Sequence, residues 1–399
     1  MSTHSYSLSG YGPQKKSAWG RVTARDSAVW RLDWVMVLAG IGLSIVGSLL
    51  VWSATRNRTD LNQGDPYYFV TRHVLSLVVG LLLMAGMVWL GHRRVRGAVP
   101  FLYGATLLLA LLVLTPLGAT INGQRAWLHL GGGFSLQPAE FVKITVILGM
   151  AMLLAARVDA GDREHPDHRI VLQALGLAAA PIVVIMLMPD LGSVMVMVII
   201  VLGVLLASGA SNRWIVGLSA AGTGGAVLVW ALGLLDEYQI DRFAAFANPA
   251  LDPSGVGYNT NQARIAIGSG GLSGKGLFEG SQTTGQFVPE QQTDFVFTVA
   301  GEELGFLGGA LIILLLGVVI WRACRIAREA SELYSTIVAA GVIAWFAFQS
   351  FENIGMTLGI MPVAGLPLPF VSYGGTSMFA VWIALGLLQS IRVQRPVSA

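Results

Sequence analysis

The sequence predicts an all-α polytopic membrane protein with ten transmembrane helices, and three observations support this fold class. Hydrophobic residues make up 54% of the 399 positions, whereas charged residues make up only 12%. The apolar residues gather in runs of about twenty, which is the length that crosses a bilayer as a helix. Lysine and arginine concentrate in alternate segments between these runs, as expected when one side of the membrane is cytoplasmic.

Ten apolar runs define the predicted spans. We place them at residues 33–53, 73–91, 98–117, 139–156, 170–188, 191–209, 214–234, 295–320, 335–357 and 368–390. The segment before them, residues 1–32, is polar and basic and lacks an apolar core with a cleavage site. We therefore expect a disordered cytoplasmic tail there rather than a signal peptide. A short cytoplasmic tail, 393–399, is expected after the membrane domain, 33–392.

The distribution of basic residues predicts the orientation of the chain. With the N-terminus inside, 17 of the 25 lysines and arginines fall in the predicted cytoplasmic segments, seven fall in the outer segments, and Lys143 lies within a span. Because basic residues collect in cytoplasmic loops, we expect both termini in the cytoplasm. The large loop between the seventh and eighth spans, residues 235–294, is then extracytoplasmic.

Asp294 stands where this long polar loop meets the next apolar run, and it is the candidate catalytic residue. An ionisable group at a membrane boundary is costly unless it is paired or used. The alternative is that Asp294 only caps a helix, since Asp favours that position. Glu302 and Glu303 are expected deeper in the span 295–320, either protonated or paired with Lys143 or an arginine.

Four further polar residues in or beside the spans are candidates for substrate binding. Glu140 and Lys143 are three residues apart, so on a helix they share one face and can pair. A structural ion pair and a substrate role remain open alternatives for them. Arg72 begins the second span, where a long side chain can also snorkel to the interface. Asp190 follows a proline in an outer turn, where the role of a turn former is favoured.

The outer loops contribute three more candidates for substrate binding. Trp127 lies after the third span, where tryptophan is common in any case, but beside Arg125 it can hold an anionic, partly apolar ligand. Arg264 and Lys275 lie in the long loop and can neutralise a pyrophosphate. The glycine-rich residues 268–276 do not match a nucleotide P-loop, and close packing against helices is the favoured alternative.

Two outer segments have predicted shapes. Residues 257–267 can form a short helix on the outer surface. The last outer loop, 353–377, has three prolines between Pro362 and Pro369, which prevent a continuous helix. Broken backbone at membrane depth must be covered by protein or line a cavity, so we expect this loop to dip into the bundle and form a wall of the site.

Eight ordered motifs resemble those of the SEDS (shape, elongation, division and sporulation) family of bacterial cell-wall proteins. They are QPAEFVK at 137–143, PDLGS at 189–193, GY at 257–258, AIGSGGLSGKG at 266–276, FVPE at 287–290, TDF at 293–295, GEELG at 301–305 and PLPFVSYGG at 367–375. Residues 353–362 and 365–370 are more similar to RodA, the elongation member, than to FtsW, the division member. Two positions depart from the family pattern: Gln292 replaces a frequent histidine, and the order of residues 124–127 is permuted, which leaves the role of Arg125 open.

The resemblance implies a peptidoglycan glycosyltransferase of the bacterial cytoplasmic membrane. It would polymerise lipid II at the outer face during cell elongation, beside a class B penicillin-binding protein that cross-links the strands. The resemblance assigns polymerisation to the aspartate of the Thr-Asp-Phe motif, here Asp294. It also places five of the candidates in or near a central cavity: Arg72, Trp127, Glu140, Lys143 and Asp190.

The implied reaction joins two lipid-linked disaccharides when a sugar hydroxyl attacks an anomeric carbon and undecaprenyl pyrophosphate leaves. We expect Asp294 to take the hydroxyl proton, Arg72 and Lys143 to position the pyrophosphate, and Glu140 to hold Lys143. Similarity to metal-assisted enzymes implies Mg²⁺ or Mn²⁺, although the sequence shows no dedicated cage for either ion. No organic cofactor or nucleic acid is expected. A lipid II flippase and a non-catalytic scaffold for a transpeptidase are the alternative functions.

Overall fold

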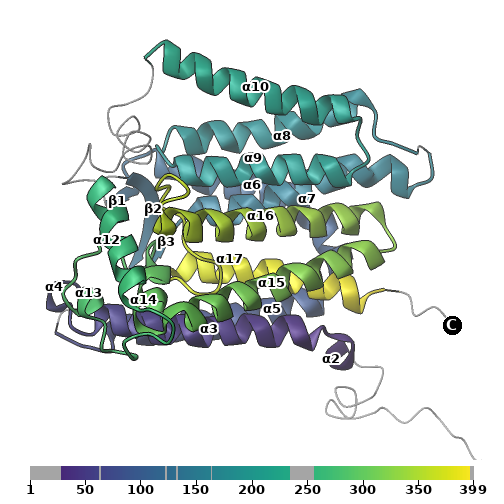
Figure 1. Ribbon diagram of the computed structural model, residues 1–399. Helices are drawn as coiled ribbons and strands as arrows, with labels where there is room; N and C mark the ends of the chain where they lie inside the picture. The colour runs from purple at the N-terminus through teal and green to yellow at the C-terminus, as the bar shows by residue number, and fades with distance from the viewer. Residues whose placement is uncertain are drawn as a thin grey trace, which may run out of the picture.

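The computed structural model describes residues 28–62, 64–121, 124–131, 134–162, 164–233 and 256–395. Within these residues, ten helices of at least 17 residues lie side by side with their long axes in similar directions (Figure 1). They are α3 (Trp34–Thr55), α5 (Tyr68–Leu90), α6 (His92–Val113), α7 (Pro138–Asp159), α8 (His168–Met186), α9 (Leu191–Ala207), α10 (Asn212–Ala231), α15 (Gly305–Glu329), α16 (Leu333–Leu358) and α17 (Gly375–Val393). Each of the ten overlaps one predicted span.

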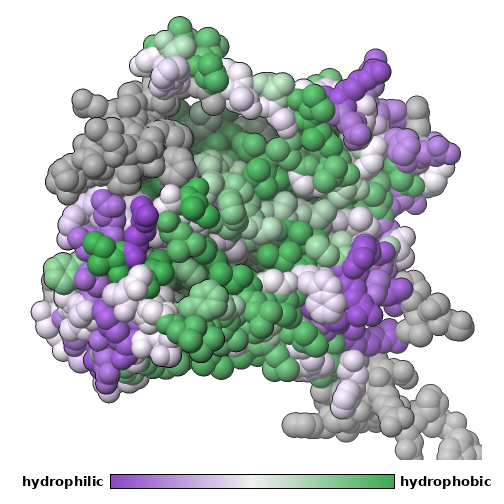
Figure 2. All heavy atoms as spheres, in the orientation of Figure 1, coloured by the Kyte–Doolittle hydropathy of each residue, from purple (hydrophilic) through white to green (hydrophobic). Residues whose placement is uncertain are grey.

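The composition of these helices is that of membrane spans. Within the described part of the chain, eight of them are long and apolar enough to cross a membrane, and α9 is a shorter apolar helix. Figure 2 shows a broad hydrophobic band across the molecule with hydrophilic residues gathered at both ends. A soluble protein rarely exposes so large an apolar surface. The protein is therefore an all-α polytopic membrane protein with about eight to ten helical spans.

The two ends of the bundle carry different structures (Figure 1). One end, which we call the loop end, carries a small sheet and the short helices α4 (Thr59–Asn62), α12 (Val256–Ser269), α13 (Ser281–Thr284) and α14 (Val296–Glu303). The opposite end, the tail end, carries α2 (Ala28–Arg31), which lies within the predicted tail 1–32. The short helix expected at 257–267 is present as α12. The rest of that tail, 1–27, and residues 234–255 of the predicted long loop lie outside the described residues.

The predicted span 295–320 is wrong at its start. The helix breaks between α14 and α15 at Gly305, whose φ of 65° is a left-handed conformation that glycine adopts at little cost. A side chain at Gly305 would also clash with the backbone of Gly274. The expected position of Glu302 and Glu303 deep within this span is wrong for the same reason, because both residues precede the spanning helix α15. The last span likewise begins later than predicted, at Gly375 instead of residue 368.

A three-stranded antiparallel sheet lies between α6 and α7, where the sequence analysis expects only a loop. Its strands are β1 (Gly118–Ile121), β2 (Gln124–Gly131) and β3 (Phe134–Leu136), in the order β1-β2-β3. Ile121 pairs with Gln124, so β1 and β2 are separated by two residues of sequence, Asn-Gly. This dipeptide is the strongest short-range indication of a β-hairpin, so the sequence contained a sign of the sheet.

Glycines allow the helices of the bundle to approach closely. A Cβ at Gly80 of α5 would lie 2.7 Å from the ring of Trp382 on α17, and a Cβ at Gly47 of α3 would clash with the carbonyl of Val371. Lipid tails are as apolar as the helix surfaces, so helix association in a membrane depends on such close packing and on polar contacts. Small residues at these contacts therefore bring α5 and α3 against the C-terminal part of the chain.

A buried acidic residue joins the helices at the tail end. Asp33, which is 1% exposed, pairs through Oδ2 with Arg322 at 2.6 Å and Arg392 at 3.1 Å. Its Oδ1 accepts a hydrogen bond from the backbone N–H of Met36 and so caps α3. The side chain of Gln389 bonds both the N–H and the carbonyl of Asp33. One carboxylate thus connects the start of α3 to α15 and α17.

Candidate functional site

Asp294 lies in a tight turn, residues 286–295, that leads into α14. The turn contains two residues with positive φ, Gln286 at 57° and Glu290 at 50°, which is uncommon for residues other than glycine. The carbonyl of Glu290 accepts a hydrogen bond from Phe295 N–H, and its carboxylate accepts one from Thr293 Oγ1 at 3.0 Å. Asp294 is half-buried within this turn rather than at the regular N-cap of α14. The capping alternative therefore does not describe its position.

The segment 359–374 passes beside Asp294 without regular helix or strand structure, and we call it the proline loop. Five of its apolar residues are at most 6% exposed: Ala364, Leu366, Leu368, Phe370 and Val371. Gly365, with φ of 70°, lies so close to Asp294 that a Cβ there would be 3.5 Å from Oδ2. The expectation that this loop dips into the bundle and forms a wall beside the aspartate is confirmed.

Lys143 and Glu140 form a fully buried ion pair on α7. The distance from Lys143 Nζ to Glu140 Oε1 is 2.8 Å, and the two side chains are 0% and 1% exposed. The ammonium group also donates to Gln349 Oε1 at 3.0 Å and lies 4.6 Å from the ring centre of Trp345. Gln349 in turn donates from Nε2 to the carbonyl of Pro367. The pair therefore links α7 and α16 to the proline loop and is closed to solvent in this conformation.

Arg72 approaches the Asp294 turn through Tyr373, the penultimate residue of the proline loop. Its guanidinium lies 4.1 Å from the ring centre of Tyr68 and hydrogen-bonds the side chain of Tyr373. The backbone N–H of Tyr373 donates to the carbonyl of Gln292 at 2.8 Å. Arg72 is partly exposed, so a cation is present beside the turn that carries Asp294.

Asp190 is the N-cap of α9, in agreement with the favoured turn-forming role. Its Oδ1 accepts from Ser193 N–H at 2.9 Å, and its Oδ2 accepts from Ser193 Oγ and from Gln137 Nε2. The adjacent Gly192 lies against the proline loop, because a Cβ there would be 2.5 Å from the carbonyl oxygen of Ala364. Asp190 therefore holds the start of α9 against the N-terminal end of α7 and beside the proline loop.

Trp127 lies in strand β2, where it pairs with Ala119 of β1. Its neighbour Arg125 donates to the carbonyl of Thr115 just after α6. Arg125 therefore anchors the sheet to the bundle. Among the described residues, the contacts of Trp127 lie within the sheet and not at the Asp294 turn.

Lys275 and the glycine-rich residues 268–276 pack against the junction of α14 and α15. Lys275 Nζ is 2.8 Å from Glu302 Oε1. Backbone N–H groups of Lys275 and Gly276 donate to the carbonyls of Glu302 and Glu303. A side chain at Gly270 or Gly274 would clash with the backbone of this junction. The packing alternative for the glycine-rich loop is thus confirmed, and Lys275 is paired with Glu302 rather than with Asp294.

Glu302 accepts hydrogen bonds from the glycine-rich segment and from α13. Besides Lys275, it accepts from Gln282 N–H, Thr283 N–H and Thr283 Oγ1, each at 2.8 Å. Burial would raise the pKa of Glu302, but these hydrogen bonds outweigh it and hold the pKa below its ordinary value. For Glu303, burial dominates and raises the pKa even though Ser53 Oγ donates to Oε1 at 2.6 Å. The predicted pairing of Glu302 or Glu303 with Lys143 is wrong, because Lys143 pairs with Glu140.

Arg264 is exposed on α12 and lies beside the first residue of the proline loop. A Cβ at Gly359 would be 3.3 Å from Arg264 Cδ. Asp294, Arg72 and Arg264 therefore lie beside the proline loop. The pair of Lys143 and Glu140 reaches the loop through Gln349, and Asp190 is connected to it through Gly192. Trp127 lies in the sheet and Lys275 pairs with Glu302, so both make their contacts at other positions of the loop end.

Sequence reasoning missed several residues that build this arrangement. Gln349, Asn353 and Tyr373 connect the candidates to one another through hydrogen bonds. His73, 1% exposed on α5, stacks on Tyr373 with ring centres 6.2 Å apart, and neither ring nitrogen has a hydrogen-bond partner among the described residues. A buried amide or imidazole inside an apolar run was the available indication, because such groups are costly in a membrane.

The site offers no ready-made metal centre in the described residues. Nowhere among them do three His, Cys, Asp or Glu side chains gather as potential metal ligands. Hard cations such as Mg²⁺ require several oxygen ligands in a regular arrangement. The donor set around Asp294 thus does not fit a dedicated cation site among the described residues.

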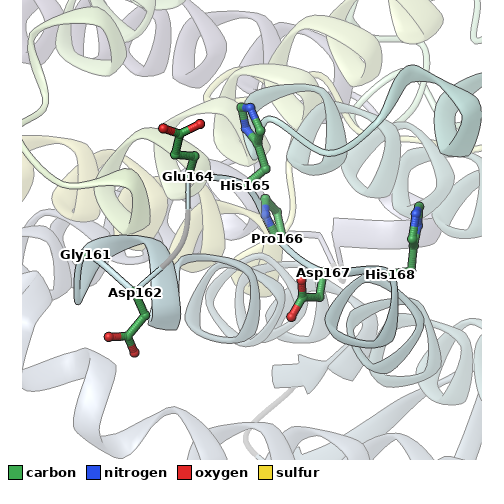
Figure 3. Close-up of a pocket in the computed structure, with 7 residues that line it drawn as sticks. All are labelled: Gly161, Asp162, Glu164, His165, Pro166, Asp167 and His168. Atoms are coloured by element: carbon green, nitrogen blue, oxygen red, sulfur yellow. The ribbon is translucent and has the colours of Figure 1, made fainter.

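A separate depression of about 570 Å³ lies at the tail end, in the connection between α7 and α8. Figure 3 shows its lining residues, which include Asp162, Glu164, His165, Asp167 and His168. Their side chains diverge instead of converging on one point, and they belong to the end of the bundle opposite Asp294. This depression is not part of the candidate site.

The protein is thus a polytopic membrane protein whose helix bundle carries a cluster of polar residues at one end. The profile of the FtsW/RodA/SpoVE family, described as "Cell cycle protein", matches residues 33–396. The chain therefore belongs to the SEDS family and is a multi-pass protein of the bacterial cytoplasmic membrane.

Individual relatives match over nearly their whole length. Stage V sporulation protein E of Bacillus subtilis (strain 168) is 36% identical over 360 residues, which cover 90% of this chain and 96% of that protein. Peptidoglycan glycosyltransferase MrdB of Escherichia coli (strain K12) is 33% identical over 383 residues, covering 96% and 97% respectively. A chain from a solved peptidoglycan synthase complex has a TM-score of 0.73 and 31% identity, with 91% of this chain and 98% of that chain covered.

We predict that Lys143→Ala lowers the stability of the folded protein by about 3–5 kcal/mol, because it leaves the Glu140 carboxylate buried without its counter-charge. Thermal unfolding in detergent measures the change. The double variant Glu140→Gln with Lys143→Met should recover most of the loss, since it buries no charge. An unchanged unfolding midpoint together with lost activity would instead assign Lys143 to the substrate.

We also predict a pH-dependent effect of Glu302→Gln. The depressed pKa of Glu302 stabilises the fold fully above its ordinary value of 4.5, and this contribution is lost as the pH falls through the folded-state pKa. The variant should therefore unfold at a lower temperature than the wild type at pH 7, and the difference should shrink below pH 4.5. A difference that stays constant down to strongly acidic pH would contradict the assignment.

Proposed function

We propose that this protein is a peptidoglycan glycosyltransferase that polymerises lipid II into glycan strands. The observation that carries the proposal is the half-buried Asp294 carboxylate, held in a strained turn against the proline loop with Arg72 nearby. A relative with 33% identity over almost the whole chain is named for this activity. The combination of a single carboxylate and a partly exposed cation suits a reaction that removes a proton and releases a pyrophosphate.

We propose that the loop end faces the outside of the cell. Basic residues concentrate at the tail end, on the first residues of α6 and the last residues of α15 and α17, and this asymmetry supports a cytoplasmic tail end. With ten spans, both termini are cytoplasmic and the large loop before Asp294 is extracytoplasmic. Lipid II on the outer leaflet then reaches Asp294 without crossing the membrane.

In the proposed reaction, Asp294 acts as general base. It accepts the proton of the attacking sugar hydroxyl as the oxygen bonds to the anomeric carbon of the second molecule. The bond from that carbon to the pyrophosphate oxygen breaks, and undecaprenyl pyrophosphate leaves with the electron pair. A single displacement inverts the anomeric centre, so an α-linked donor gives a β-linked strand.

We assign the pyrophosphate to the cations that solvent can reach, Arg72 and Arg264. Lys143 and Glu140 are sealed between α7 and α16, so we assign them to packing behind the proline loop.

The remaining candidates have supporting roles. Asp190 supports the proline loop through α9, and Lys275 holds the glycine-rich segment against Glu302. Trp127 remains a proposed contact for the lipid-linked substrate at the interface.

We further propose that the protein acts in cell elongation, with a class B penicillin-binding protein as its transpeptidase partner. The sequence of 353–370 supports the first point, because it is more similar to RodA than to FtsW. A structural relative that belongs to a peptidoglycan synthase complex supports the transpeptidase partner.

The alternative function, a lipid II flippase, has no comparable support. The polar groups Lys143 and Glu140 in the middle of the bundle are covered by α16 and do not line a passage.

The deciding experiment measures lipid II polymerisation by the purified protein with its transpeptidase. We predict that Asp294→Asn keeps the fold but lowers the rate by about 10²–10⁴-fold, the range that a general base contributes. Asp65→Asn is the matched control, since it makes the same change in an exposed turn at the loop end. Wild-type rates from a well-folded Asp294→Asn protein would remove Asp294 from this role.

A divalent cation, Mg²⁺ or Mn²⁺, is proposed as a counter-ion that binds with the substrate phosphates. We predict that a chelator stops polymerisation, that added Mg²⁺ or Mn²⁺ restores it, and that the unfolding temperature without substrate does not change. The last result is expected because no resident cation site is present among the described residues. Polymerisation at full rate in excess chelator would exclude the cation.

A further inference from the structure

Three consecutive carbonyl groups of the Asp294 turn are held by groups from elsewhere in the sequence. The carbonyl of Gln292 accepts from Tyr373 N–H at 2.8 Å, and that of Thr293 accepts from Ser372 Oγ at 2.5 Å. The carbonyl of Asp294 accepts from Asn353 Nδ2 at 2.7 Å. The backbone around the carboxylate is thus fixed by tertiary contacts that no local helix or strand supplies.

The two side chains in this set also hold the proline loop. Asn353 Nδ2 donates a second hydrogen bond to the carbonyl of Leu366 at 2.6 Å. Ser372 Oγ accepts one from the backbone N–H of Leu368 at 2.7 Å. Each side chain therefore bridges the Asp294 turn and the proline loop, and we call the pair Asn353 and Ser372 the clamp.

Both members of the clamp are buried, and the amide oxygen of Asn353 lacks a hydrogen-bond partner among the described residues. Asn353 is 0% exposed and Ser372 is 3% exposed. The Asn353 Nδ2 group serves two carbonyls, while its Oδ1 has no hydrogen-bond partner in the described residues. A buried amide oxygen without a partner costs free energy. The Asn353 side chain therefore acts through its Nδ2 group, which donates to the carbonyls of Asp294 and Leu366.

We propose that Asn353 and Ser372 are positioning residues that set the orientation of Asp294 for proton transfer. The proposal rests on the proposed function of Asp294. The turn's own hydrogen bonds run from Thr293 and Phe295 to Glu290, so they do not hold the carbonyls that the clamp binds. With the clamp in place, the carboxylate stands over Gly365, where the missing side chain leaves room beside Oδ2.

Matched variants separate positioning from general stability. Ser372→Ala and Asn353→Asp remove a donor from the clamp. Ser335→Ala and Gln389→Glu make the same kinds of change at the tail end, where Ser335 is also 3% exposed and hydrogen-bonded to His92, and Gln389 is also 0% exposed. Ser372→Thr keeps the hydroxyl and serves as the conservative variant.

The first test does not depend on catalysis. Cys324 is the single cysteine of the sequence, so Cys324→Ser with Asp294→Cys leaves one thiol, at position 294. We expect Ser372→Ala and Asn353→Asp to speed its modification by N-ethylmaleimide about fivefold or more, because loss of the clamp frees the turn locally. The tail-end controls and Ser372→Thr should leave this rate nearly unchanged. Equal rates of thiol modification in all variants would contradict the proposed role of the clamp.

The second test uses lipid II polymerisation. Clamp variants should lower kcat by about 100-fold with little change in KM, as expected when a catalytic group is displaced by about 1 Å. The same fall in both tail-end controls would indicate general destabilisation and contradict the proposal. If the thiol test succeeds while Asp294→Asn still polymerises lipid II, the clamp stands and the proposed catalytic role of Asp294 fails.

Discussion

The rest of the site depends on one constraint, that backbone groups buried in a membrane protein need partners within the protein. The prolines of the proline loop prevent a helix, yet the loop lies inside the bundle. Its polar backbone groups are instead bonded by side chains: Gln349 donates to Pro367, Asn353 donates to Leu366, and Ser372 accepts from Leu368. These bonds attach the loop to α16 and to the Asp294 turn, so the elements that bear the candidate residues are assembled around it.

Buried charge has a different role at each level of the bundle. At the tail end, Asp33 ties three helices through two arginines. In the middle, Lys143 and Glu140 neutralise each other and connect α7 to α16. At the loop end, Glu302 pairs with Lys275 of the glycine-rich segment and accepts backbone hydrogen bonds from α13. Each charge is paired, as expected where an isolated one would be prohibitively costly. Asp294 differs from these in lying half-exposed at a turn, which suits a residue that exchanges protons with a substrate.

This division gives the proposed enzyme a rigid support and an accessible reacting group. The paired residues stiffen the bundle behind the proline loop, whereas Arg72 and Arg264 stay accessible at its two ends. A reaction between two lipid-linked molecules needs the base to be fixed and the pyrophosphate to be neutralised. The arrangement at the loop end meets both requirements with a small number of side chains.

Asp294 was singled out by its position at a membrane boundary, and its catalytic role was inferred from the resemblance to the SEDS motifs. The membrane class, the approximate positions of the spans, the short helix at α12 and the inward course of the proline loop were predictable from the sequence alone. These features follow from local composition, apolar run length and the backbone limits of proline, all of which act over short distances along the chain. The folded structure was needed to show that Lys143 is sealed, that Lys275 pairs with Glu302, that α14 and α15 are separate, and that Asn353 and Ser372 hold the turn. Those outcomes depend on which groups meet across helices distant in sequence, and a single sequence does not specify such contacts.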